Sequence, residues 1–122
     1  MTQGSADILI HNYKIPTSKI TVIAHGTHLA PAKDKYAILE YFNLVGKKVL
    51  STFGLLGPSK SIETTLYALP SIIEQNPNVI FLVLGMTHPN LLRIDGESYR
   101  NELEAIVDEF GISAHVRFIN EF

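Results

Sequence analysis

The sequence contains no cysteine, no long basic run and no apolar segment of membrane-spanning length. Without cysteine the chain has no disulfides and no thiolate metal sites. Its formal net charge is -2, and nothing in the charge pattern indicates a nucleic-acid partner. The first residues, MTQGSAD, lack the basic-then-apolar order of a signal peptide. We therefore expect a cytoplasmic protein with no membrane span.

The chain is instead rich in hydrophobic residues, which make up 46% of its 122 positions and suit one compact core. From Lys48 onward, apolar runs alternate with helical spacing in the order strand, helix, strand, helix, strand. The five predicted segments are 49–53, 62–73, 79–84, 99–110 and 115–119. Helical crossovers imply parallel strands. The predicted fold class is α/β, with a three-layer, Rossmann-like parallel sheet present as a βαβαβ half.

Two further apolar runs precede this unit and predict extra N-terminal strands. They cover residues 6–10 and 19–24, with a polar turn between them. A half sheet of three parallel strands would also leave one apolar edge unpaired. Either residues 6–24 or a second copy of the chain would cover that edge, and the sequence leaves both possibilities open.

The central stretch KVLSTFGLLGPSKSIETTLYALP carries the strongest functional signal. Residues 49–53 read as a buried parallel strand, which breaks at Gly54. A loop with Gly57 and Lys60 then leads into a helix that starts near Ile62. Amides at a helix start, the helix dipole and a lysine charge together favour an anion. We interpret the loop as facing the diphosphate of a nucleotide-linked ligand; the alternative is a glycine turn with a solvated lysine.

Ligands of parallel sheets bind beyond the carboxyl ends of the strands, and other candidate residues fall there. Gly85, Thr87 and His88 follow the second strand, and Asn120–Glu121 follow the last one. His25 and His28 are three residues apart, but no carboxylate stands beside them, so no metal site is predicted.

With these residues in view, the chain resembles the retaining family-four glycosyltransferases of the two-Rossmann (GT-B) type. The likeness runs over nearly the whole chain, in order and spacing. The matching stretches are KITVIAHGTH, VLSTFGLLGPSKSIETTLYALPSII, NVIFLVLGMTHPN, GESYRNELEAIVDEFGI and HVRFINEF.

The resemblance implies a domain placement and a set of site residues. Residues 1–28 would be the end of an acceptor-side domain and the crossing between domains, and residues 29–122 the first half of a donor-nucleotide-binding domain. A nucleotide-sugar donor would lie in the cleft, with no metal or other cofactor required. Lys60 would be catalytic, stabilising the leaving phosphate. The residues implied in donor binding are Gly54, Gly57, Lys60, Ser61, Gly85, Thr87 and His88.

The chain also departs from the family pattern. Leu55 stands where the family often has arginine, and Ser61 where it usually has glycine. The downstream pair of glutamates and most of the acceptor domain are absent. We therefore expect a fragment that is inactive without the remainder of its parent enzyme, because transfer needs both halves of the cleft.

A second hypothesis belongs to a different class: a non-catalytic α/β fragment that forms a homodimer through an exposed sheet edge. A third, a receiver-like signalling domain, needs acids at the ends of the early strands. Residues 50–53 and 83–85 offer none.

Overall fold

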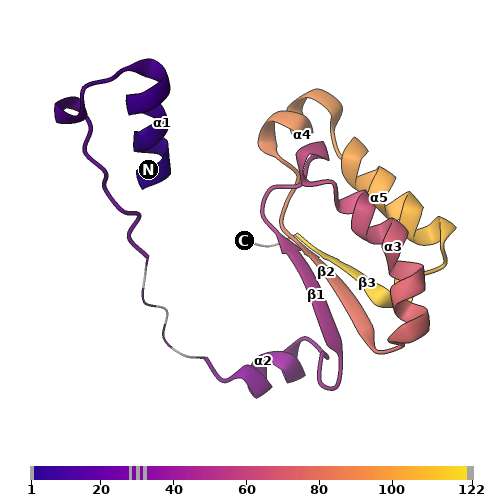
Figure 1. Cartoon of the computed structure of the whole chain (residues 1–122). Coiled ribbons are helices and arrows are strands. Elements are labelled where there is room, and N and C mark those ends of the chain that lie inside the picture. Colours follow the sequence, from indigo (N-terminus) through magenta and orange to yellow (C-terminus); the bar gives the residue numbers. More distant parts are fainter. Residues whose placement is uncertain (1, 28, 30, 32, 121–122) are drawn as a thin grey trace. The chain divides into compact units, whose positions relative to one another are not determined.

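The computed structural model describes residues 2–27, 29, 31 and 33–120 (Figure 1). The chain divides into two compact units, Met1–Lys33 and Asp34–Phe122. Within the described residues, no helix is both long enough and apolar enough to cross a membrane.

The first unit is helical where strands were predicted. Helix α1 spans Gln3–Tyr13, a 3₁₀ turn covers Thr17–Lys19, and residues 20–27 form no strand. The prediction of extra N-terminal strands at 6–10 and 19–24 is therefore wrong.

Local capping explains the first of these errors. The Thr2 hydroxyl accepts a hydrogen bond from the Ser5 amide at 3.2 Å, which caps the start of α1. An apolar run of five residues fits a helix as well as a strand, and here the Thr2 cap favours the helix. Residues 19–24 have a β-branched composition, but a strand also needs a partner, and no strand forms anywhere in residues 2–27.

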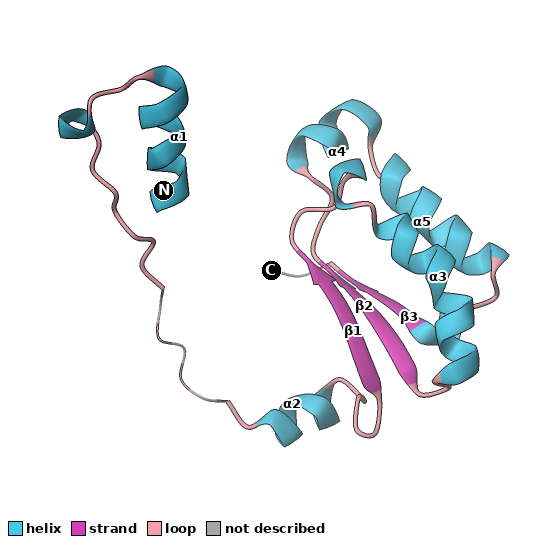
Figure 2. Cartoon of the chain, in the orientation of Figure 1, coloured by secondary structure: helices cyan, strands magenta, loops and turns pink. Residues whose placement is uncertain are grey.

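The second unit contains a parallel sheet with the strand order β1-β2-β3 (Figure 2). Strand β1 pairs with β2 in parallel, and β2 pairs with β3 in the same way. The predicted alternation of strands and helices is confirmed, with one addition: a short helix, α4, precedes α5. The bounds are Lys48–Phe53 for β1, Ile62–Gln75 for α3, Val79–Leu84 for β2, Pro89–Asp95 for α4, Ser98–Glu109 for α5 and Val116–Ile119 for β3.

Helices α3 and α5 lie on the same side of the sheet (Figure 2). Their buried leucines pack there against alternate residues of β2, as the period of a strand requires. This main core includes Leu66, Leu69, Phe81, Val83, Leu103 and Val107. The other residues of β2, Ile80 and Leu82, point to the opposite face and pack against Leu44 and Leu39, at and just after helix α2 (Lys35–Tyr41).

The two paired strands differ in burial. Strand β2 is buried along nearly its whole length, as its continuous apolar run predicts. Strand β1 is mostly exposed: Phe53 is 80% exposed, and Val49 and Leu50 are about 40% exposed. The prediction of a buried strand at 49–53 is right about its parallel pairing and wrong about its burial. The reason is that little packs on its faces: no residue of β1 belongs to either core cluster of the described residues, whereas β3, also at an edge of the sheet, contributes Val116 to the main core.

Candidate functional site

The carboxyl ends of β1 and β2 meet at two glycines. The Gly54 amide donates to the Leu84 carbonyl at 3.0 Å, and the Gly85 amide donates to the Ile119 carbonyl at 2.8 Å. An ideal Cβ built on Gly85 would lie 2.0 Å from the carbonyl oxygen of Gly54. Gly85 also has a φ of +132°, which side-chain-bearing residues rarely adopt. The backbones of two predicted site residues therefore touch, and this contact requires glycine at position 85.

The ammonium group of Lys60 lies at the same place. Lys60 ends a 3₁₀ turn that begins at Pro58, and its Nζ atom is 3.6 Å from the position a Cβ on Gly54 would occupy. Lys60 is exposed and forms no ion pair with any residue that the structure describes. A positive charge without an ion-pair partner among the described residues thus lies next to the glycine that follows β1.

The start of α3 is closed by side chains from the protein itself. The Ile62 amide donates to the phenol oxygen of Tyr99 at 3.2 Å, and the Tyr99 hydroxyl donates to a Glu63 carboxylate oxygen at 2.6 Å. Burial, and then the hydrogen bond to Glu63, raise the pKa of Tyr99 to about 12, so the phenol keeps its proton near neutral pH. The Ile62 amide therefore points at Tyr99, and positive charge for a ligand at this edge comes chiefly from Lys60.

Sequence reasoning missed this role of Tyr99. It placed the residue in a helix start, and the pair Tyr99–Ile62 is 37 residues apart. The one signal was the segment GESYR (96–100), which the resemblance singled out without a function. Its residues make the polar contacts that tie α5 to its neighbours.

The loops after β1 and β2 run side by side. Leu56 and Thr87 form a parallel bridge, in which the Leu56 amide donates to Met86 at 2.8 Å and the His88 amide donates to Leu56 at 2.9 Å. An open pocket of about 320 Å³ lies between the loops and holds the predicted residues Gly57 and His88. Its lining consists of Leu55, Leu56, Gly57, Pro58, Ser59, His88, Asn90 and Leu91.

Gly57 and His88 shape opposite sides of this pocket. A Cβ on Gly57 would lie 2.9 Å from a methyl carbon of Leu91 on α4, so a larger residue would displace the Leu91 side chain and narrow the pocket. The Nδ1 atom of His88 accepts a hydrogen bond from the Asn90 amide at 3.1 Å and caps α4. In the neutral ring, the proton is then on Nε2.

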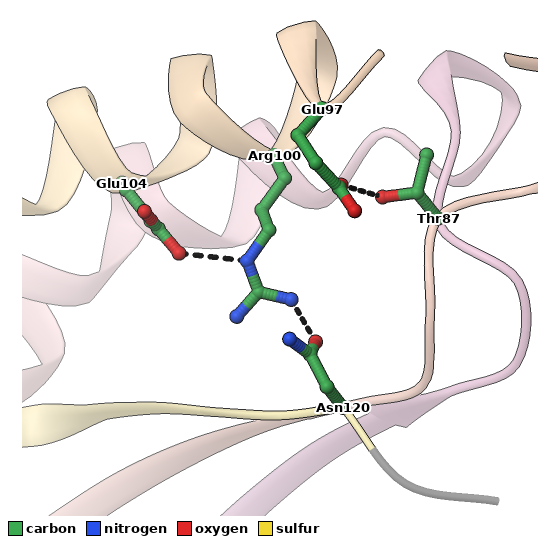
Figure 3. Close-up of polar contacts among 5 residues, drawn as sticks. All are labelled: Thr87, Glu97, Arg100, Glu104 and Asn120. Atoms are coloured by element: carbon green, nitrogen blue, oxygen red, sulfur yellow. Dashed lines mark hydrogen bonds and ion pairs between the residues drawn. The ribbon is translucent and has the colours of Figure 1, made fainter. Parts of the chain in front are cut away.

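Thr87 and Arg100 are engaged within the protein (Figure 3). Thr87 is 4% exposed, and its hydroxyl donates to the Glu97 carboxylate. Arg100 pairs with Glu104 at 2.8 Å, donates to Asn120 and lies 5.2 Å from the centre of the Phe118 ring. Arg100 thus pairs within its own helix and contacts the end of β3, and the Thr87 hydroxyl binds Glu97, the residue just before α5.

The remaining predicted positions lie elsewhere or outside the described residues. Ser61 follows Lys60 and is exposed. His25 belongs to the first unit, and His28 and Glu121 are outside the described residues. Among residues 2–27, 29, 31 and 33–120, no group of three histidine, aspartate or glutamate side chains is placed to hold a metal ion.

The second unit is thus an α/β unit in which the glycine loops and Lys60 lie at the carboxyl edge of a parallel sheet. No protein-family model matches the chain. It is 26% identical over 125 residues to a D-inositol 3-phosphate glycosyltransferase from Corynebacterium efficiens, in an alignment covering 98% of this chain. The chain spans 28% of the length of that protein. The similarity is a distant relation to a glycosyltransferase.

Proposed function

We propose that residues 29–122 are the first half of the donor-binding domain of a nucleotide-sugar-dependent glycosyltransferase. One observation carries the proposal: the Lys60 ammonium, which forms no ion pair with any described residue, lies beside Gly54, whose backbone is packed against Gly85. The carboxyl edge of a parallel sheet is where such folds bind nucleotides. The distant glycosyltransferase relative supports the same class of activity.

In this proposal Lys60 binds the diphosphate of the donor. When the bond between the sugar and the diphosphate breaks, negative charge grows on the leaving oxygen. A fixed ammonium group stabilises that charge more than it stabilises the bound donor, which lowers the barrier. Residues 1–28 would belong to the acceptor-side domain and the crossing. The chain spans 28% of its relative, so we propose binding for this chain and transfer for a parent enzyme with both halves of the cleft.

The test is a calorimetric titration of the full chain with uridine, guanosine and adenosine diphosphates. We expect Lys60→Ala to raise the dissociation constant about tenfold or more, since hydrogen bonds to charged groups contribute about 1.5–3 kcal/mol. The matched control is Lys47→Ala, which removes the same charge just before β1, at the opposite end of the strand. Equal affinities of the wild type and Lys60→Ala would refute the proposal.

The exposure of β1 favours a second candidate, self-association without a ligand. Val49, Leu50 and Phe53 are exposed on an edge strand, and such edges pair with other strands. Light scattering combined with the nucleotide titration separates the two candidates. A dimer that binds no nucleotide supports self-association, and a monomer that binds nucleotide refutes it.

A further inference from the structure

The turn that carries Lys60 adopts an unfavourable backbone conformation. Ser61 has φ 47° and ψ 44°, in the left-handed region, and its side chain makes no capping hydrogen bond. Residues with a side chain rarely adopt this region. Two backbone hydrogen bonds support the turn from within: the Lys60 amide donates to Gly57 at 2.9 Å, and the Ser61 amide donates to Pro58 at 3.1 Å. Contacts from outside the turn add to this support.

Tyr99 supplies those contacts from α5. Its phenol oxygen accepts from the Ile62 amide, directly after Ser61, and its hydroxyl donates to Glu63. The half-buried Tyr99 ring packs against the main core. A rigid side chain anchored in the core thus holds the residue that follows the strained one.

We propose that Tyr99 is a positioning residue for the diphosphate site: it holds Ser61 in the left-handed conformation and thereby keeps Lys60 beside Gly54. The inference rests on the proposed function for the identity of the ligand. Tyr99 does not touch the ligand in this account and acts through the turn alone.

The energetics make the effect measurable. A hydrogen bond of ordinary net strength is comparable to the cost of a left-handed serine, so losing the bond lets the turn relax into other conformations. When only a fraction of the molecules retains the competent turn, the apparent dissociation constant rises by the inverse of that fraction. Glycine at position 61 adopts the left-handed conformation freely and removes the need for an external contact.

The experiment is a four-protein cycle on the full chain, titrated with inorganic pyrophosphate. Tyr99→Phe, which keeps the ring and loses the hydroxyl, should raise the dissociation constant about fivefold. In the Ser61→Gly background, the same substitution at Tyr99 should change the dissociation constant by less than about twofold. A loss that disappears in this background is not expected if Tyr99 contacts the ligand, and the exchange measurement below separates positioning from a general loss of fold stability.

The matched control is Tyr67→Phe on α3, which removes a hydroxyl from a half-exposed tyrosine. It should bind like the wild type. Wild-type affinity in Tyr99→Phe overturns the inference, and so does an equal loss of affinity when Tyr99→Phe is made in the Ser61→Gly background.

A second readout separates this inference from the proposed function. The Lys60 amide donates to the Gly57 carbonyl within the turn at 2.9 Å and reports on the turn without involving Tyr99. Its hydrogen exchange should be faster in Tyr99→Phe and return towards the wild-type rate in the double variant, while core amides of β2 are unchanged. If the wild type binds neither pyrophosphate nor nucleoside diphosphates, the proposed function fails. Unchanged exchange at Lys60 would instead show that Tyr99 does not hold the turn and would refute the inference, whatever the ligand.

Discussion

Strands β1 and β2 are each six residues long, contain valine, leucine and phenylalanine, and pair residue for residue from Lys48–Val79 to Phe53–Leu84. β2 lies between two strands, and its alternating residues meet α3 and α5 on one face and Leu44 on the other. Within the part of the chain that the structure describes, β1 contributes no residue to either core cluster and remains largely exposed. The difference shows that the burial of a strand depends on what packs on its faces as well as on its own residues.

The largest expected effect compares the phenylalanines of the two strands. Phe81→Ala in β2 empties a core position that is 3% exposed and should lower the free energy of unfolding by about 3–5 kcal/mol. Phe53→Ala at the end of β1, where the ring is 80% exposed, should change it by less than about 0.5 kcal/mol. Urea denaturation measures both. Similar losses from the two variants would mean that β1 is covered in solution.

The glycines that end the two strands should differ next. Gly85→Ala places a methyl group against the Gly54 carbonyl at a strained φ, and we expect a loss of about 3 kcal/mol. Gly54→Ala also meets an unfavourable φ, of +117°, but its methyl group would contact only the movable end of Lys60. Its loss should be about 1–2 kcal/mol. Thermal denaturation of both variants measures the two losses. A larger loss in Gly54→Ala than in Gly85→Ala would contradict the close contact between the two backbones.

The loops beyond the strands sharpen the comparison further. The loop after β2 enters α4 with its own cap from His88, whereas the loop after β1 passes through the strained Ser61. Ser61→Gly should therefore raise the free energy of unfolding by about 1 kcal/mol. The control Ser59→Gly, in the 3₁₀ turn where φ is not positive, should lower it slightly. If Ser59→Gly also stabilised the protein, the gain in Ser61→Gly would not come from the left-handed conformation of residue 61.

The smallest expected effect is a pH dependence of the free energy of unfolding, which comes from Tyr99, the residue that contacts the loop after β1 through Ile62. Burial and then the bond to Glu63 raise the pKa of Tyr99 from 10.0 to about 12. Between these values the unfolded chain has lost a proton that the folded chain retains. The contribution of Tyr99 to stability is therefore complete below pH 10 and is lost as the pH rises towards 12. Denaturation at pH 9 and 11 should show a smaller loss in Tyr99→Phe than in the wild type; equal losses would argue against this pKa.

Local patterns in the sequence predict much of the second unit. Ile62, Leu66 and Leu69 recur at helical spacing and are buried in α3, and the apolar run 79–84 is the central strand. The short helix α4 was not predicted, although Pro89 at its first position and the His88 cap are recognisable signals. The first unit was misread because short apolar runs suit a helix and a strand alike.

The candidate site was predictable only in its outline. Parallel topology implies that Gly54 and Gly85 end at the same edge, and the structure brings them into contact. The capping of Ile62 by Tyr99 and the pairing of Thr87 with Glu97 depend on side chains that are distant in sequence. Local spacing contains no information on such pairs, because they form only when α5 packs beside α3 and the loop after β2.

The contact between Gly54 and Gly85 has a consequence for how the sheet assembles. If β2 slipped by one residue against β1, Leu84 or Met86 would bring a side chain to the point where the Gly54 carbonyl now fits against bare backbone. Hydrophobic patterning already disfavours a slip, since it would exchange the two faces of the strand. The contact between the two glycines adds a steric penalty for any other register. It therefore helps to fix the alignment of β1 and β2 at the end of the strands where the loops begin.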